Sequence, residues 1–237
     1  MNRVVNRVVN RDRARLAAVR VAGVAGVLAL ATAVTFASHS AATAGVTGLL
    51  AKYSPARLAA GRVWTVPASA FLLGHPHMLG PTSAMLALVF LPYALWCGIG
   101  RAGITAMSGH VVATLVVAAV VLPGSWLGWT TGTTIAHTLD YGSSAALAAC
   151  AGGLAVLIGH RLPVVGPVTG TVLLALVAGF FAFHLFSVPK LDANVADIEH
   201  LVALFTGVAV EWSLFGRTAP PQPAAGAPAR TVASTRA

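Results

Sequence analysis

Residues 139–161 read LDYGSSAALAACAGGLAVLIGHR, a run almost free of charge between Asp140 and Arg161. A turn residue, Gly142, and two adjacent hydroxyls, Ser143 and Ser144, come first, and small and apolar residues then continue to the basic end. At 1.5 Å per residue, an apolar helix of this length reaches across most of a hydrocarbon core about 30 Å thick. The stretch therefore predicts a membrane helix that begins with two serines.

The composition of the whole chain agrees with this interpretation. Hydrophobic residues make up 57% of the 237 positions and charged residues only 9%, whereas about a quarter of a soluble domain is charged. Prolines at 67, 76 and 81 interrupt the apolar block from Val63 to Gly100, so its first half is expected to be a membrane-associated loop. We expect an all-α polytopic membrane protein with six spans, at about 21–42, 82–99, 103–122, 143–159, 166–187 and 195–215.

Three segments follow from this division. Residues 1–20 form a basic cytoplasmic segment, 21–216 the six-helix transmembrane domain, and 217–237 a tail of Pro, Ala, Gly, Ser and Thr that has too little to bury and is expected to be disordered. The small residues of SAATAG, residues 40–45, leave a cleaved signal peptide open. An uncleaved anchor is favoured, because the arginine-rich leader is long and the first span has full length.

The distribution of Lys and Arg predicts the orientation. With the N-terminus inside, the inner side carries eleven of them against four outside, namely Lys52, Arg57, Arg62 and Lys190. We therefore expect both termini in the cytoplasm and a bacterial plasma (inner) membrane as the location. The net charge of +9 then reflects topology and affinity for membrane lipids, and binding of nucleic acid is not expected.

The sequence predicts no cofactor and no metal. Cys97 and Cys150 both fall inside predicted spans, which favours packing over a disulfide or a metal-binding pair. There is no phosphate-binding GxxxxGK[ST] loop and no HExxH pair. Five scattered histidines show no ligand spacing and are expected to be interfacial or bundle-facing, namely His75, His77, His110, His137 and His184.

Ionisable residues within spans are costly and therefore point to function, and two of them lie on the sixth span, His200 and Glu211. Ser144 precedes Arg161 by seventeen residues and His200 precedes Arg217 by seventeen, so both side chains lie about 25 Å from the inner boundary. Small residues follow each of them at helical spacing, at positions 148, 151 and 152 and at 203 and 207. Such faces let two helices approach closely, either as a plain packing seam or to bring Ser144 and His200 together.

A serine beside an imidazole can lose its proton while it attacks a carbonyl group. Ser144 is the candidate nucleophile and His200 its base, with Ser143 as the alternative nucleophile. Gly142 is expected to allow the turn that exposes the hydroxyl, and the free amides at the helix start could stabilise an oxyanion. Asp140 is expected to cap the helix or order the preceding loop. Glu211 is expected to pair near Trp212 or Arg217 or to extend toward the interface, without a catalytic part.

These stretches resemble rhomboids, the six-helix intramembrane serine proteases. GSSA, residues 142–145, resembles the GxSG motif that opens helix four of the family, and EHLVALFTG, residues 199–207, resembles the AHxxGxxxG motif of helix six. WTVPASAFLL and AMLALVFLP resemble the region that leads into helix two and helix two itself, so the likeness covers about residues 62–215. The resemblance implies Ser144 as nucleophile, His200 as base, and transmembrane segments of single-pass membrane proteins as substrates.

The chain departs from the family pattern at several positions. Ala145, Glu199 and Ala203 replace a glycine, an alanine and a glycine of the two motifs. The family's HxxxN motif on helix two, which helps to bind the oxyanion, is matched here by Gly80 and Ala84. His77, Thr82 or Ser83 are the candidate substitutes.

Three interpretations therefore remain open. The first is an active intramembrane serine endopeptidase. The second is a rhomboid-like protein without catalytic activity that binds transmembrane helices of client proteins. The third is a transporter or channel that uses His200 and Glu211, although the sequence shows no inverted repeat and no pair of broken helices.

Overall fold

The computed structural model describes residues 2–39, 52–73, 76–138, 142–187 and 191–218. Almost all of these residues are helical. The elements are α1 (Asn2–His39), α3 (Pro55–Ala59), α4 (Thr65–Ser69), the 3₁₀ turn η1 (Pro76–Met78), α5 (Leu79–Met85), the π-helical turn η2 (Leu86–Phe90), α6 (Leu91–Cys97), α7 (Ile99–Trp126), α8 (Thr130–His137), α9 (Ser143–Arg161), α10 (Gly166–Ser187) and α11 (Leu191–Thr218).

Six helical segments within the described residues are long and apolar enough to cross a membrane. They confirm the predicted all-α, multi-pass architecture and match the six expected spans in order. Their bounds are Ala14–Ala37, Leu79–Cys97, Ile99–Trp126, Ser143–Arg161, Gly166–Ser187 and Asn194–Phe215.

The first helix starts much earlier than the sequence analysis placed it. α1 is continuous from Asn2, because neither proline nor glycine interrupts residues 2–20 and the basic segment can extend the helix of the span. Near the start of the span, the Arg20 guanidinium donates to the carbonyl oxygen of Leu95 at the end of α6. The predicted end of this span, residues 40–42, lies outside the described residues.

The second span is one continuous run of helical turns that begins at Leu79, earlier than predicted, because Pro81 fits in the first turn. In its middle the Leu91 amide donates to the carbonyl of Leu86, five residues back, which makes η2 a π-helical turn. Pro92 follows directly and has no amide hydrogen to donate, which accounts for the local change of hydrogen bonding. Upstream, the predicted loop contains the short helix α4, and another short helix, α3, precedes this loop.

The third span continues past its predicted end at residue 122, through Pro123 and Gly124, and ends at Trp126. Gly128, with φ of 76°, then turns the chain back into α8. A Cβ on Gly132 would lie 2.7 Å from the Gly124 carbonyl carbon, so glycine allows α8 to pack directly on the end of α7. Pro123 lies inside α7 and has no amide hydrogen to donate to the carbonyl four residues back, so the last turn lacks one helical hydrogen bond.

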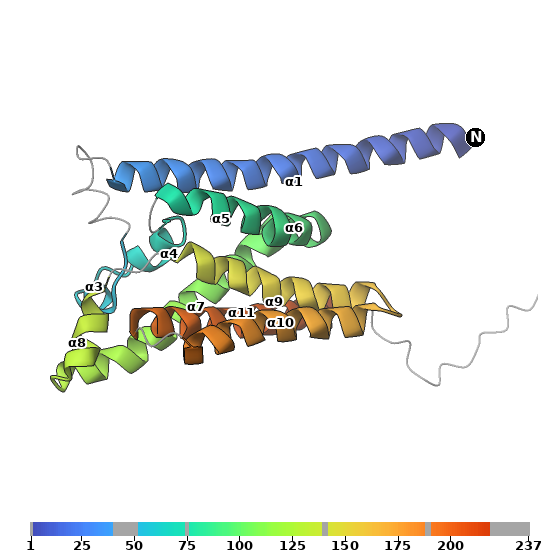
Figure 1. Cartoon of the computed structure of the whole chain (residues 1–237). Coiled ribbons are helices and arrows are strands. Elements are labelled where there is room, and N and C mark those ends of the chain that lie inside the picture. Colours follow the sequence, from blue (N-terminus) through green and yellow to red (C-terminus); the bar gives the residue numbers. More distant parts are fainter. Residues whose placement is uncertain (1, 40–51, 74–75, 139–141, 188–190, 219–237) are drawn as a thin grey trace, which may run out of the picture.

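α9 is the central helix of the bundle, and α10 lies at its margin. Of the most apolar window of each helix, 61% of residues are buried in α9 but only 6% in α10. Figure 1 shows α9, α10 and α11 side by side, with α7 crossing them and with α1, α5 and α6 on the other side of α9. Most of α9 therefore lies within the bundle rather than on its outer wall.

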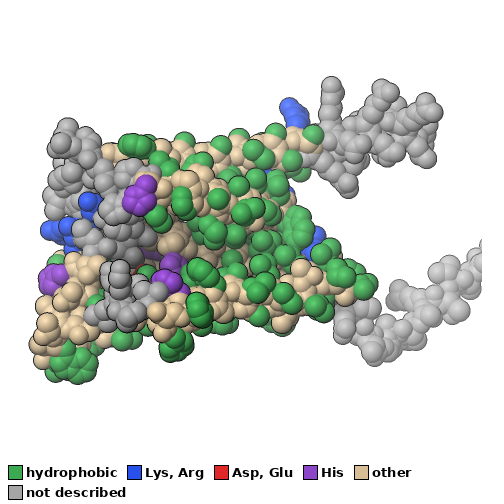
Figure 2. Space-filling model, in the orientation of Figure 1, with side chains coloured by type: hydrophobic (Ala, Val, Ile, Leu, Met, Phe, Trp, Pro, Cys, Tyr) green, Lys and Arg blue, Asp and Glu red, His purple; other side chains and the backbone are tan. Residues whose placement is uncertain are grey.

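Charge gathers at the two ends of the molecule. Figure 2 shows hydrophobic side chains over the middle of the visible face and Lys and Arg side chains toward its ends. Arg101 and Arg161 lie at the end where α9 finishes, which we call the arginine end. Ser143 and Ser144 lie at the opposite end, which we call the serine end.

Candidate functional site

α9 and α11 pack backbone against backbone. A Cβ on Gly207 would lie 1.9 Å from the Ala149 carbonyl oxygen, and one on Gly152 would lie 2.1 Å from that of Leu204. Neither space admits a side chain, so both positions require glycine. Ala148, Ala151 and Ala203 are buried in the same region. The predicted contact between the small-residue faces of these two helices is therefore confirmed.

The register of this α9–α11 seam bears directly on Ser144 and His200. Ser144 lies between one and two helical turns before Ala149, and His200 lies between one and two turns before its contact Gly207. The two helices run in the same direction. Ser144 and His200 therefore lie at similar levels at the serine end of the seam.

The two side chains differ in their surroundings. Ser144 is exposed in the first turn of α9. His200 is half-buried and its ring stacks on Phe181 of α10, with 4.6 Å between centroids and 18° between planes. Phe181 also packs against the buried alanines of α7, α9 and α11. This contact places the His200 imidazole close to the serine end of the seam. No hydrogen bond between described residues joins Ser144 to His200.

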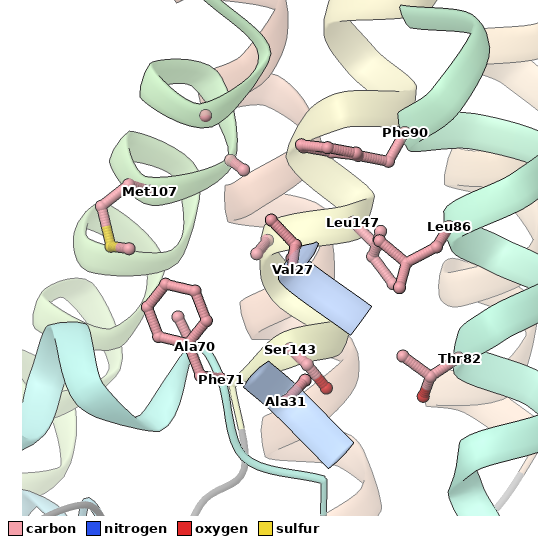
Figure 3. Close-up of a pocket in the computed structure, with 13 residues that line it drawn as sticks. Val27, Ala31, Ala70, Phe71, Thr82, Leu86, Phe90, Met107, Ser143 and Leu147 are labelled. Carbon is pink, nitrogen blue, oxygen red and sulfur yellow. The ribbon is translucent and has the colours of Figure 1, made fainter. Parts of the chain in front are cut away.

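Ser143 faces a different space. It lines an apolar cavity of about 210 Å³ between α1, α5, η2, α7, α9 and the two residues that follow α4. Figure 3 shows Ser143 and Thr82 at one end of this cavity and Phe90 at the other. The two adjacent hydroxyls of α9 are thus separated: Ser143 borders an apolar cavity, whereas Ser144 is accessible from outside.

The helix-two positions that align with the rhomboid HxxxN motif do not face this cavity. Gly80 and Ala84 are both exposed, whereas Thr82 between them lines the cavity. Ser83 donates to the Leu79 carbonyl oxygen at 2.6 Å, and His77 is exposed on η1. Of the candidate substitutes, Thr82 alone lines the same cavity as Ser143, and Asp140 lies outside the described residues.

Gly142 has a different role from the predicted one. Its φ of −79° and ψ of 1° are accessible to any residue, so the turn does not require glycine. The requirement is steric, because a Cβ on Gly142 would lie 1.7 Å from Cε1 of His110. The imidazole of α7 thus packs directly on the residue that caps α9.

His110 also joins α7 to α4. Its Nε2 lies 2.8 Å from the Val66 carbonyl oxygen and 3.0 Å from Ser69 Oγ, and the side chains of His110 and Ser69 are fully buried. A carbonyl oxygen only accepts, so Nε2 carries the hydrogen. Ser69 Oγ itself donates to the Val66 carbonyl at 2.9 Å. This Ser–His contact is therefore not a nucleophile and its base, since the ring nitrogen facing the serine has no lone pair to accept a proton.

A buried ion pair lies at the arginine end. Glu211 is fully buried and its carboxylate meets Arg101 at 2.8 and 3.0 Å, while the Tyr93 hydroxyl donates to it at 2.5 Å. Tyr93 also shares a hydrogen bond of 2.9 Å with Thr105. The expectation that Glu211 pairs near Arg217 or extends to the interface was wrong, because α11 turns it inward toward α6 and α7.

The remaining polar groups of these helices give no metal site. In the described ranges there is no group of three or more His, Cys, Asp or Glu side chains placed to hold an ion. His184 and Asp197 join α10 to α11 through a contact of 2.6 Å. Cys150 is fully buried in the core and Cys97 packs at its edge, as the packing interpretation expected.

Comparison with protein-family models, curated proteins and solved structures finds no match to this chain. Its chemistry therefore has to be inferred from the geometry given above.

Proposed function

We propose that this chain is an intramembrane serine protease of the rhomboid type, with Ser144 as nucleophile and His200 as general base. One observation carries the proposal. The glycine contacts of the α9–α11 seam set a register in which Ser144 and His200 reach the serine end at similar levels, Ser144 exposed and His200 half-buried. A seam that only packed helices together would not require a serine and a histidine there.

The proposed reaction is acyl transfer. Ser144 Oγ attacks the carbonyl carbon of a peptide bond while the His200 imidazole takes the hydroxyl proton. The tetrahedral intermediate collapses by breaking the C–N bond, and His200 gives its proton to the leaving amine. Water, deprotonated by His200, then attacks the ester; Ser144 leaves with the proton and the carboxylic acid is released. Exposure of Ser144 supports access for both the peptide and the water.

Stabilisation of the oxyanion rests on the backbone in this proposal. Amides in the first turn of a helix have no partner within that helix, so those of Ser143 and Ser144 are candidate donors. Gly142 supports this turn, and neither His77 nor Asp140 is assigned a role here. Without the side-chain donors of the HxxxN motif, we expect the rate to be lower by about two orders of magnitude.

The substrates in this proposal are transmembrane segments of single-pass membrane proteins, in a plasma (inner) membrane with both termini of this chain in the cytoplasm. The apolar surface supports a partner that enters from the lipid, because α10 exposes Phe180, Phe183 and Phe186 along one helix. Contact with membrane lipids follows from the same surface.

A second candidate is a rhomboid-like protein that binds transmembrane helices without cleaving them. Gly80 and Ala84 favour it, because both positions lack a hydrogen-bonding side chain and face away from the cavity. In that case a client helix would contact the exposed apolar surface of α10, and Ser144 would not be needed.

Labelling by a fluorophosphonate probe in detergent or bilayers separates the two candidates. Wild type is compared with Ser144→Ala, His200→Ala and Ser143→Ala, and Ser213→Ala serves as a matched control because Ser213 is an exposed serine on α11. We expect labelling to be lost in the Ser144 and His200 variants and kept in the other two.

The result that would contradict the protease is absence of labelling in wild-type protein that unfolds cooperatively. Client binding that survives Ser144→Ala would then support the second candidate. Loss of labelling in Ser143→Ala alone would move the nucleophile to Ser143 and its apolar cavity.

A further inference from the structure

We propose that His110 is a positioning residue that sets the first turn of α9 and thereby the placement of Ser144. The inference rests on the proposed function for its catalytic consequence, although its structural part can be measured separately. Nothing in the chemistry of the Ser144 and His200 pair requires a second histidine, and His110 Nε2 binds Val66 and Ser69 of α4 instead. It acts through Gly142.

Three segments that are far apart in the sequence meet at this histidine. Nε2 binds the Val66 carbonyl and Ser69 Oγ of α4, while the edge of the same ring packs on Gly142. Ser69 closes the arrangement from the other side, because its carbonyl oxygen accepts from the Gly142 amide at 3.1 Å. α4, α7 and the start of α9 are thus held by a single buried hub, which we define as Ser69, His110 and Gly142.

The hub is more specific than apolar packing. A fully buried imidazole is destabilising unless its polar atoms have partners, and Nε2 has two oxygen atoms within 3.0 Å. An apolar side chain of similar size would fill the space but leave the Ser69 hydroxyl without this donor. The ring also leaves no room for a side chain at 142, so His110 and Gly142 constrain each other.

The position of the hub explains why it matters for Ser144. Gly142 is the residue that caps α9, and the exposed Ser144 follows it by two residues. The first turn of a helix has few hydrogen bonds of its own, so its geometry depends on outside contacts. If the hub loosens, Ser144 and its neighbouring amides move together relative to His200, which is held by α11 and Phe181.

The test uses cysteine reactivity in the full chain. Ser144→Cys is placed in a Cys97→Ala background, and alkylation by a water-soluble maleimide is followed by mass spectrometry at the introduced thiol and at the natural Cys150. Cys150 is fully buried, so its alkylation reports global unfolding, whereas the thiol at position 144 reports the first turn of α9. His110→Phe keeps a ring without the Nε2 donor, and His110→Gln restores an N–H of similar reach.

We expect His110→Phe to change the alkylation rate at position 144 about five-fold, as loss of one buried hydrogen bond implies, with the rate at Cys150 unchanged. His110→Gln should return the rate at position 144 to within about two-fold of the parent. Ser69→Ala, a smaller change, should act in the same direction as His110→Phe. Equal rates at position 144 in all variants, or parallel changes at that position and at Cys150, would overturn the inference.

A double substitution tests the steric part. Gly142→Ala alone should strongly change the alkylation rate at position 144, because its Cβ meets the His110 ring, and His110→Ala should relieve much of this effect by removing that ring. Strictly additive effects would count against the hub. If wild-type Ser144 never reacts with the fluorophosphonate but the thiol at position 144 responds as expected, the protease proposal fails while the positioning of this turn by His110 stands.

Discussion

The two ends of the bundle use polar residues in opposite ways. At the arginine end, Glu211 is fully buried and its carboxylate contacts both Arg101 and Tyr93. At the serine end, Ser144 is exposed and His200 is half-buried against an aromatic ring. A group already engaged by strong partners contributes to the folded state, whereas a reactive group has to be reached by substrate and water. The difference indicates a structural role for the arginine end and agrees with the chemistry that we propose for the serine end.

The buried ion pair of Glu211 shows that a charged residue within a membrane span can have a structural role. An ionisable residue within a span is by default a functional candidate, and Glu211 would qualify by that rule. Its surroundings instead tie three helices together, with Tyr93 on α6, Arg101 on α7 and Glu211 on α11. The contacts of such a residue therefore carry more weight than its presence in a span.

The largest expected effect is on the arginine end. Glu211→Ala removes the acceptor for Arg101 and Tyr93 and leaves a partly buried cation unpaired, so the free energy of unfolding should fall by about 3–5 kcal/mol. Unfolding by denaturing detergent measures this loss. Glu211→Gln, which keeps an acceptor oxygen, should lose less.

The same variants can break the comparison between the two ends. If Glu211→Ala unfolds like wild type but the folded protein no longer reacts with the fluorophosphonate, Glu211 acts in the chemistry and the arginine end is not purely structural. If unfolding changes and the folded fraction still reacts, the division holds.

The sequence sufficed for the six spans and for the small faces of α9 and α11, because hydropathy and helical spacing are local properties. The similar depth of Ser144 and His200 in the membrane could also be predicted, since each lies seventeen residues before an arginine at the same boundary. The start of α1 could not be predicted from the sequence, because a basic helix and a basic loop have similar composition.

The contacts between segments that are distant in the sequence could not be predicted. His110 was visible as an ionisable residue within a span, which was a usable signal, but its partners Ser69 and Gly142 lie 41 residues before it and in the turn before α9. The sequence predicts that Gly142 serves by its backbone freedom, whereas in the structure it allows close packing of the His110 ring. Pairing of Glu211 with Arg101, 110 residues apart, likewise depends on the order of helices in space.

The seam between α9 and α11 supports both ends, and its disruption should have an intermediate effect. Gly207→Ala would place Cβ 1.9 Å from a backbone oxygen, so we expect a loss of about 1–3 kcal/mol in unfolding free energy together with slower labelling of Ser144. Gly179→Ala on α10 is the matched control, because no atom lies within 4 Å of its Cβ position. Equal behaviour of the two variants would show that the helices do not touch at Gly207.

The smallest expected effect concerns the serine end alone. Phe181→Leu keeps an apolar side chain but removes the ring on which His200 stacks, a contact worth about 0.5–1.5 kcal/mol, so labelling of Ser144 should slow several-fold while unfolding changes little. Phe183→Leu, on the exposed face of the same helix, should leave labelling unchanged. If labelling of Ser144 slows in Phe181→Leu but not in Phe183→Leu, the His200 imidazole is oriented by α10 as well as by α11. Equal rates in both variants would mean that α11 alone fixes His200, and that the marginal packing of α10 has no part in placing the proposed base.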